Sequence, residues 1–161
     1  MVYQRNMGAW MNKENWIKNV IIVSGGFDPV HKGHIRMFRE AANLGHQVIV
    51  GLNSDEWLTR KKGKPFMKWE ERAEILESCK FVTQVLSMDD SDDTASDIIK
   101  KVANLYEGQD MNIYFANGGD RGKGNVPELE TCKDLNVVML WGIGGGKIQS
   151  SSWLTNGGKN E

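Results

Sequence analysis

The 161-residue sequence has no apolar run that approaches the roughly 20 residues needed to cross a membrane. Residues 1–18 mix charged side chains, asparagine and tryptophan with few aliphatic ones, so they lack the apolar core of a signal peptide. We therefore expect no membrane partner and, by default, a cytoplasmic location. The formal net charge is only −1, which argues against a nucleic-acid partner for the chain as a whole.

Cysteine is also scarce. Cys79 and Cys132 are the only two, they fall in different predicted helices, and they lack the Cys-x-x-Cys spacing of many metal and redox sites. We expect both thiols to be buried and reduced. The acidic run 89–93 favours a solvated loop that leads into a helix cap over a metal site, so we expect no metal ion held by the protein itself.

Two common nucleotide-binding signatures are missing. The Gly-x-Gly-x-x-Gly fingerprint does not follow the first predicted strand, which argues against an NAD-type oxidoreductase. Residues 142–147, Gly-Ile-Gly-Gly-Gly-Lys, have a superficial likeness to a P-loop. However, Trp141 stands where the first glycine is required and Ile148 replaces the serine or threonine.

What the sequence does contain is a regular alternation of short apolar runs and longer amphipathic segments. Nearly continuous apolar strands that alternate with helices predict an α/β fold with a parallel sheet covered on both faces. The predicted strands are residues 20–23, 47–52, 81–86, 111–116 and 137–141. The predicted helices are residues 32–44, 68–79, 94–106, with a cap at Asp92 or Asp93, and 127–135.

The length and the composition, 40% hydrophobic and 25% charged, predict one soluble globular domain. We assign residues 20–155 to this domain and residues 156–161 to a flexible tail. Residues 1–19 form an extension of uncertain structure, in which Trp10, Trp16 and Ile17 could pack as a short helix.

The most informative stretch is residues 24–34, which reads Ser-Gly-Gly-Phe-Asp-Pro-Val-His-Lys-Gly-His directly after the first predicted strand. His31 and His34 are one helical turn apart where a helix should begin, so we expect both rings to face the same way. A helix N-terminus offers free N–H donors and the positive end of a dipole, which suits phosphate. Glycine donors and paired imidazoles at this point indicate a site that holds a polyphosphate.

Each part alone has a plain structural interpretation. A single histidine is more often a structural residue than a catalytic one, and a Gly-Gly pair is often only a turn. The order of strand, glycines, Asp-Pro, His-x-Gly-His and amphipathic helix favours a functional site.

Other polar segments fall at the same edge of the predicted sheet, because ligands bind beyond the carboxyl ends of parallel strands. Residues 117–121, Asn-Gly-Gly-Asp-Arg, follow the fourth strand, and residues 143–152 follow the fifth. The three serines in this last segment, with Lys147 nearby, indicate either a flexible tail or a helix start that donates to a phosphate.

A cationic segment, residues 60–64 or Arg-Lys-Lys-Gly-Lys, follows the second strand. It could be a solvated loop, a weak nucleic-acid patch without interleaved aromatics, or a mobile lysine loop that closes over phosphates. Arg72, one turn into the next helix, could be an exposed residue with i,i+4 contacts or could direct its guanidinium at a phosphate.

Residues 25–34 closely resemble the signature of the cytidylyltransferase-like nucleotidyltransferases. The resemblance covers most of the chain from residue 20 to residue 154, at consistent spacing. Within the family, glycerol-3-phosphate cytidylyltransferases and heptose-phosphate adenylyltransferases look most similar. The further segments that carry the likeness are residues 53–56, 60–64, 69–76, 118–120 and 150–152.

The resemblance implies a Rossmann-like, doubly wound five-stranded sheet in the order 3-2-1-4-5. It implies transfer of a nucleoside monophosphate from CTP or ATP to a phosphorylated polyol or sugar such as glycerol 3-phosphate, with release of pyrophosphate and with Mg²⁺ beside the triphosphate. The alternatives are a heptose-phosphate adenylyltransferase that uses ATP and a non-catalytic nucleotide-sensing module.

The resemblance also assigns roles by position. It implies that Asp28 supports the turn or the acceptor. The residues implied in catalysis are His31, His34, Lys61, Lys64 and Arg72. The residues implied in nucleotide binding are Gly25, Gly26, Phe27, Asp28, Gly33, Asp120, Lys147, Ser150, Ser151 and Ser152.

Two departures from the family pattern matter. Lys147 is the only cation where cytidylyltransferases carry an arginine before the serine/threonine run, which leaves CTP and ATP both open. The helix that normally follows this run is cut to residues 153–155 and a glycine-rich tail, so a homodimer contact from it stays open as well.

Overall fold

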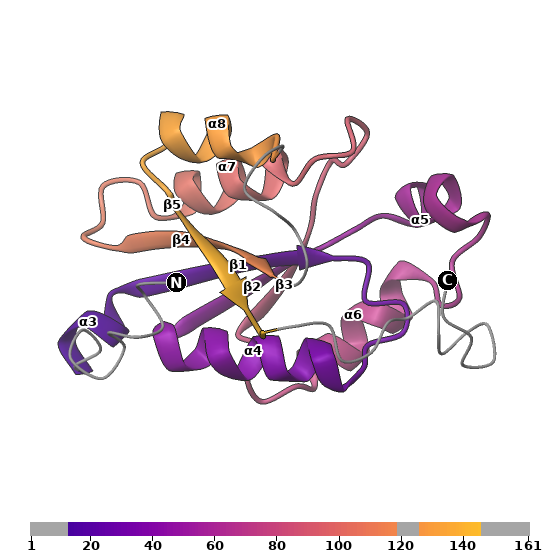
Figure 1. Cartoon of the computed structure of the whole chain (residues 1–161), viewed down its shortest axis with the longest axis horizontal. Coiled ribbons are helices and arrows are strands. Elements are labelled where there is room, and N and C mark those ends of the chain that lie inside the picture. The colour runs from indigo at the N-terminus through magenta and orange to yellow at the C-terminus, as the bar shows by residue number, and fades with distance from the viewer. Residues whose placement is uncertain (1–12, 119–125, 146–161) are drawn as a thin grey trace.

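The computed structural model describes residues 13–118 and 126–145. Its centre is a parallel five-stranded sheet in the order β3-β2-β1-β4-β5 (Figure 1), which confirms the predicted class and strand order. The strands are β1 (Asn19–Gly25), β2 (Gln47–Leu52), β3 (Gln84–Ser87), β4 (Asn112–Gly118) and β5 (Val138–Ile143).

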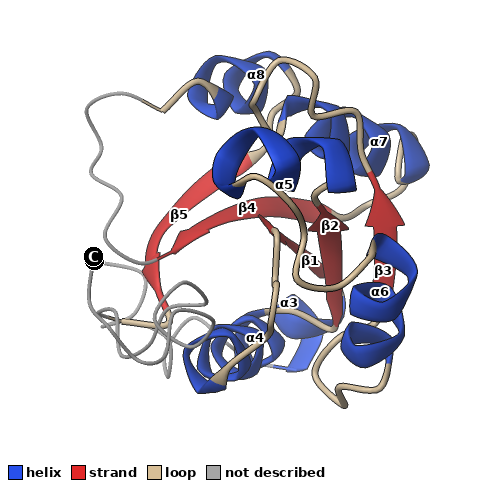
Figure 2. Ribbon diagram, turned by 90° about the vertical axis from the view of Figure 1, so that its right-hand side faces the viewer, coloured by secondary structure: helices blue, strands red, loops and turns tan. Residues whose placement is uncertain are grey.

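Helices cover both faces of the sheet (Figure 2). Helices α4 and α6 lie on one face, and α7 and α8 lie on the other. The helices are α3 (Lys13–Ile17), α4 (Lys32–Leu44), α5 (Asp55–Lys62), α6 (Trp69–Glu77), α7 (Ser96–Leu105) and α8 (Glu128–Asp134). None of these described helices is long and apolar enough to cross a membrane.

The core has two halves, because successive strand residues point to opposite faces. Ile21 and Val23 of β1 pack with Phe38 and Leu76 on the α4/α6 face. Ile22, between them in sequence, packs with Ile98 and its neighbours on the α7/α8 face. The central strand is therefore apolar at each of residues 20–23, which is why these residues form a continuous hydrophobic run in the sequence.

Helix α5 is not among the predicted helices, because the sequence pattern indicated only a cationic segment, residues 60–64, after the second strand. Its sequence is mostly polar, but both of its ends carry residues that stabilise a helix. The Ser54 Oγ accepts a hydrogen bond from the Trp57 N–H at 3.0 Å, which caps the first turn. Asp55 and Glu56 occupy the first turn and three cations the last, so the charges favour the helix dipole at both ends.

The predicted cap of α7 is wrong in detail. The helix begins at Ser96 after Ala95, with no side-chain cap, whereas Asp92 instead accepts a hydrogen bond from the Thr94 N–H at 2.9 Å. The third strand begins at Gln84 rather than Phe81, because Phe81 packs against the α4/α6 half of the core.

The expected helix with Trp16 and Ile17 is present as α3, and the Trp16 indole donates to the Ala42 carbonyl at 2.7 Å. Trp10 lies outside the described residues.

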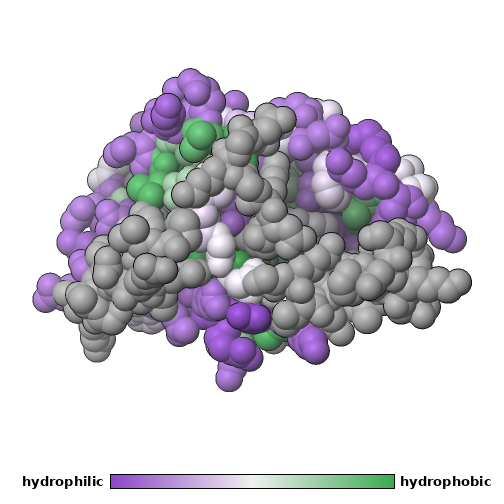
Figure 3. Space-filling view, viewed as in Figure 1, coloured by the Kyte–Doolittle hydropathy of each residue, from purple (hydrophilic) through white to green (hydrophobic). Residues whose placement is uncertain are grey.

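On the face drawn in Figure 3 most of the described residues at the surface are hydrophilic, with hydrophobic ones at several places. Figure 3 shows hydrophobic residues in the part of the view where α8 and the start of β5 lie. The large exposed hydrophobic side chains of these two elements are Leu129, Leu135 and Val138.

Candidate active site

The two histidines of the signature form the start of α4. The Gly33 N–H donates to His31 Nδ1 at 3.1 Å, and the His31 N–H donates to His34 Nδ1 at 3.2 Å. These two bonds make a reciprocal capping box from two imidazoles. The rings stack with centroids 3.7 Å apart and planes 18° apart, which confirms the prediction that both face the same way.

The same two bonds fix the tautomer of each ring. An Nδ1 that accepts a hydrogen bond carries no proton, so in the neutral ring the proton is on Nε2. Burial, and to a lesser degree the neighbouring His31, lowers the pKa of His34 to about 3. Phe27 contributes to this burial, since its ring meets the His34 ring edge-on at 4.8 Å. The His34 ring is therefore a neutral N–H donor over the whole physiological pH range.

The turn before the histidines is tightly packed. A Cβ at Gly26 would lie 2.9 Å from Leu58 Cδ2, and one at Gly25 would lie 3.0 Å from Phe27 Cζ. Phe27 itself has φ of 47°, in the left-handed region, which turns the chain from β1 toward α4. The turn thus brings the backbone of residues 25–27 beside the histidine rings, as the sequence predicted.

Asp28 is an anchor inside this turn. Its side chain is buried, and its carboxylate accepts hydrogen bonds from the Phe66 N–H at 2.6 Å and the Met67 N–H at 2.7 Å. The Lys62 ammonium completes the set at 2.7 Å from Oδ2 and also donates to the Asp28 carbonyl. Of the two expected roles, these contacts match support of the turn.

The three lysines after β2 have different surroundings. Lys62, which the sequence did not single out, contacts Asp28, whereas Lys61 is exposed in the last turn of α5 with its ammonium 5.4 Å from the centre of the Trp57 ring. Lys64 is also exposed, beyond the helix. Lys61 therefore lies on a helix and not in the expected loop, while the catalytic assignment of Lys61 and Lys64 stays a prediction. Lys62 lies four residues before Phe66, and both contact Asp28. This spacing indicates a role for Lys62 only after the structure has shown that Asp28 contacts this segment.

Arg72 is completely buried, so of the two alternatives for this residue the exposed helix residue is wrong. Its guanidinium donates to the carbonyls of Gly26 at 2.8 Å, Asn53 at 2.9 Å and Met67 at 2.9 Å. It also pairs with the Asp55 carboxylate at 2.6 Å. Arg72 thus ties the glycine turn, the end of β2 and the start of α5 together, and its catalytic assignment stays a prediction.

The acidic run is not merely a solvated loop. Asp90 is buried, and its carboxylate accepts from the Asn53 amide at 2.9 Å, the Ser54 N–H at 2.8 Å and the Ser54 hydroxyl at 2.7 Å. Arg60 donates to the Asp90 carbonyl and pairs with Asp93. This corrects the sequence expectation, because Asp90 fixes the start of α5 from the end of β3.

The sheet splits at the carboxyl edge beside the glycine turn. Strand β1 pairs with β4 only as far as Ile22 and Phe115, although both strands continue for three more residues. Over those residues β1 stays paired with β2 and β4 with β5. Because β1 lies where the order of strands reverses, this split is the switch-point crevice in which parallel α/β sheets bind ligands.

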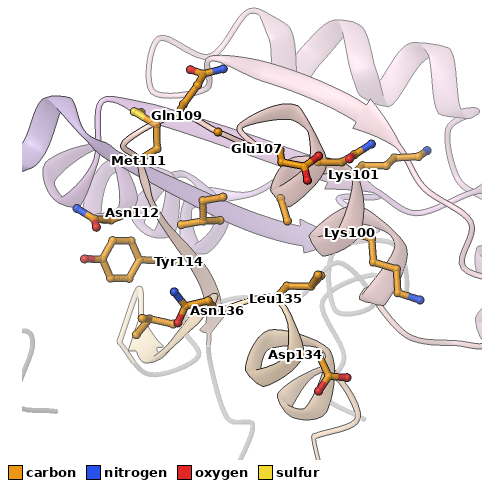
Figure 4. A pocket seen from close by; sticks show the side chains of 15 residues that line it. Lys100, Lys101, Glu107, Gln109, Met111, Asn112, Tyr114, Asp134, Leu135 and Asn136 are labelled. Atoms are coloured by element: carbon orange, nitrogen blue, oxygen red, sulfur yellow. The ribbon is translucent and has the colours of Figure 1, made fainter.

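A separate cavity of about 920 Å³ lies at the opposite, amino edge of the sheet, between the ends of α7 and α8 (Figure 4). Lys101, Glu107, Asn112 and Leu135 are among its lining residues, and none of the described candidate site residues lines it. The chemistry of the candidate site is thus at the other end of the strands.

Five predicted nucleotide-binding residues lie outside the described residues: Asp120, Lys147, Ser150, Ser151 and Ser152. Among residues 13–118 and 126–145, no group of three histidine, cysteine or carboxylate side chains is arranged to hold a metal ion. Cys132 is buried, which together with Glu128 raises the pKa of its thiol to about 11, and Cys79 is half-buried.

Comparisons with known proteins agree with this geometry. The chain is 38% identical over 124 residues to the glycerol-3-phosphate cytidylyltransferase of Bacillus spizizenii, covering 76% of this chain and 88% of that protein. It is 34% identical over 131 residues to the bifunctional protein HldE of Blochmanniella floridana, covering 75% of this chain but only 27% of that longer protein.

Two solved structures share the fold. One is the lipopolysaccharide core biosynthesis protein of Thermoplasma volcanium, with a TM-score of 0.57 and 20% identity over 75% of this chain and 93% of that one. The other is described as a nicotinate-nucleotide adenylyltransferase of Vibrio parahaemolyticus, with a TM-score of 0.58 and 14% identity over 89% and 90% of the two chains. The cytidylyltransferase-like family model matches residues 22–138. With the paired histidines and the glycine turn at the switch point, this match means that the chain belongs to the cytidylyltransferase-like family and is a nucleotidyltransferase.

Proposed function

We propose that the protein transfers a nucleoside monophosphate from CTP or ATP to a phosphorylated polyol or sugar and releases pyrophosphate. The observation that carries this proposal is the pair of stacked imidazoles whose Nδ1 atoms are both occupied by the α4 cap. In each neutral ring Nε2 then carries the proton, and it is this N–H that would donate to a ligand. The similarity to glycerol-3-phosphate cytidylyltransferases supports a polyol phosphate as acceptor.

In this reaction a phosphate oxygen of the acceptor attacks the α-phosphorus of the triphosphate. A new P–O bond forms, and the bond from the α-phosphorus to the oxygen that bridges it to the β-phosphate breaks, so that pyrophosphate leaves with that oxygen. Such transfer needs positioning and charge stabilisation more than a protein nucleophile. His31 and His34 would donate Nε2–H bonds to oxygens whose negative charge grows in the transition state.

The remaining side chains supply position and charge. The α4 N-terminus and the turn of residues 25–27 would face the phosphates with N–H groups. The exposed Lys61 and Lys64 would add flexible positive charge near the leaving group. Magnesium typically binds through substrate phosphates and water with few protein ligands, which fits a turn whose buried aspartate, Asp28, is already occupied by Lys62 and two N–H groups.

The test is pyrophosphate release, measured with CTP and ATP against glycerol 3-phosphate and a heptose phosphate. We expect one nucleotide and one acceptor class to be turned over. The variant His34→Ala should lower kcat by roughly 10² to 10³, the scale for the loss of one preorganised donor. The exposed His46, at the start of β2 on the opposite edge, gives a matched control, and His46→Ala should retain wild-type kcat.

Two outcomes count against the proposal. Absence of pyrophosphate release with every acceptor, alongside tight nucleotide binding, would contradict catalysis. A His34→Ala variant within threefold of the wild-type rate would contradict the role of the imidazole.

A further inference from the structure

Asn117 carries a buried polar group that the fold leaves unused. Its side chain is only 5% exposed, and within the described part of the chain its Nδ2 has no hydrogen-bond partner. Buried polar atoms in native proteins are nearly always paired, so an unpaired one indicates either strain or a function. Since an unmet amide donor costs free energy in the empty protein, the natural occupant is an oxygen that arrives with a ligand.

The position of Asn117 indicates which ligand. The residue stands near the end of β4, in the stretch where β4 no longer pairs with β1 and the switch-point crevice begins. It is two residues beyond Phe115, which packs on the α7/α8 face, so its side chain points to that same face. Across the crevice, Ser24 of the central strand is half-buried rather than fully buried, which leaves this row of the sheet partly open.

A flat aromatic surface lies next to Asn117. Trp141 of β5 is its register partner, is half-buried, and packs against the α7/α8 half of the core. The register shifts between Asn117 and Gly118, and β5 accommodates the shift at Gly142, which has φ of 74°. Such bulges re-aim side chains and are common beside active sites. An amide donor beside an indole face suits a polyol or sugar, whose hydroxyl oxygens accept and whose C–H groups pack on the ring.

The reaction geometry assigns this place to the acceptor and not to the leaving group. The histidine rings belong to α4, which covers the opposite face of the sheet from α7 and α8. In phosphoryl transfer the attacking and leaving oxygens lie roughly in line on either side of the phosphorus. Pyrophosphate that leaves toward the histidines is therefore displaced by an oxygen that comes from the α7/α8 side of the crevice.

We propose that Asn117 binds a hydroxyl group of the polyol or sugar acceptor, with Trp141 packing against the acceptor's carbon skeleton, and that this pair selects polyhydroxylated acceptors. The inference rests on the proposed nucleotidyl transfer. It specifies that the protein recognises the acceptor by a hydroxyl group and by its carbon skeleton.

The test is a double-mutant cycle between protein and substrate. The acceptor is glycerol 3-phosphate, or the heptose phosphate if that is the one turned over, compared with analogues that each lack a single hydroxyl. For one analogue, wild-type kcat/KM should fall by about tenfold to a hundredfold, the range for an unmet buried hydrogen bond. In Asn117→Ala the same analogue should be used nearly as well as the parent acceptor, and the KM for the triphosphate should match wild type.

Two further variants keep the test sharp. Asn117→Leu keeps a side chain of similar shape but has no hydrogen-bonding group, so it should lose the same discrimination. Asn104→Ala, on the exposed surface of α7, is the matched asparagine control and should behave as wild type. Because Asn117 Nδ2 has no partner to lose, Asn117→Ala should melt close to wild type, whereas a large drop in the melting temperature would show a structural role instead.

The outcomes separate the two proposals. Equal penalties for every analogue in wild type and Asn117→Ala overturn the inference and leave nucleotidyl transfer intact. A higher KM for the triphosphate in Asn117→Ala, with acceptor discrimination unchanged, would mean that Asn117 binds the nucleotide instead. That result also overturns the inference. If wild type turns over no acceptor, the proposed function fails and this inference fails with it.

Discussion

Replacing Arg72 tests whether a buried guanidinium holds the site together. Arg72→Ala leaves the carbonyls of Gly26, Asn53 and Met67 without their donor and leaves the Asp55 carboxylate without its partner. Each stranded carbonyl costs about 1–3 kcal/mol unless water reaches it, and the lost pair adds about 1 kcal/mol because Asp55 is partly exposed. Small domains have only about 5–15 kcal/mol of unfolding free energy, so the variant should be close to the limit of folding.

The conservative exchange separates shape from charge. Arg72→Lys keeps the positive charge, but an ammonium is a point charge with three donors and cannot reproduce the planar fork that spans three carbonyls and a carboxylate. We expect it to recover only a part of the lost stability. Asp55 is about a third exposed, so Asp55→Asn should cost only about 1 kcal/mol because solvent screens the pair.

The assay is equilibrium unfolding in urea, followed by tryptophan fluorescence and by circular dichroism, together with kcat and KM for each variant that folds. If Arg72 acts by positioning the glycine turn, kcat should fall in Arg72→Lys as the free energy of unfolding falls. The pH profile of kcat should keep its shape. An unfolding free energy for Arg72→Ala within about 1 kcal/mol of wild type would refute the reasoning, because the four contacts could then not be stabilising the fold.

Three other perturbations follow from the site. The pKa of His34 is lowered in the folded state, so between about pH 6.5 and about pH 3 the unfolded state binds more protons, and stability should fall as the pH is lowered through this window; urea midpoints of wild type and His34→Ala measured against pH check this, since only wild type should show the added slope. Lys62→Met removes the cation beside the buried Asp28 and should cost about 1–3 kcal/mol, whereas Lys64→Met, on the exposed segment after α5, should leave the unfolding free energy unchanged. Ser54→Ala should cost at least about 1 kcal/mol, because it removes both the cap of α5 and the hydroxyl that donates to the buried Asp90 carboxylate, and an unchanged urea midpoint would contradict both contacts.

Most element positions could be predicted because their causes are local, whereas the prediction of the strand order rested on the resemblance to a family. The apolar runs of β1 and β2 and the amphipathic pattern of α4 specify burial directly, and the predicted bounds of β2 and α4 match the structure. Helix α5 was missed because its stability comes from caps and end charges rather than from an apolar face, of which Leu58 is the one buried member.

The site divides in the same way. The sequence spacing predicted that the two imidazoles face the same way, whereas their stacking also depends on the extended backbone of His31 at the helix cap. The roles of Arg72, Asp90 and Lys62 were not predicted, since each depends on a partner 17 to 46 residues away that no local pattern identifies. Charged residues in a polar stretch look solvent-exposed in sequence, and only the fold reveals that Arg72 and Asp90 are buried.

The capping box at His31 and His34 divides each imidazole between two tasks, atom by atom. Nδ1 accepts the N–H that closes the first turn of α4, and in the proposed reaction Nε2 donates to the substrate. An asparagine places its side-chain oxygen near the position of Nδ1 but has no atom near that of Nε2. His34→Asn should therefore keep the helix start and lose the chemistry, so that one function of the ring can be removed without the other.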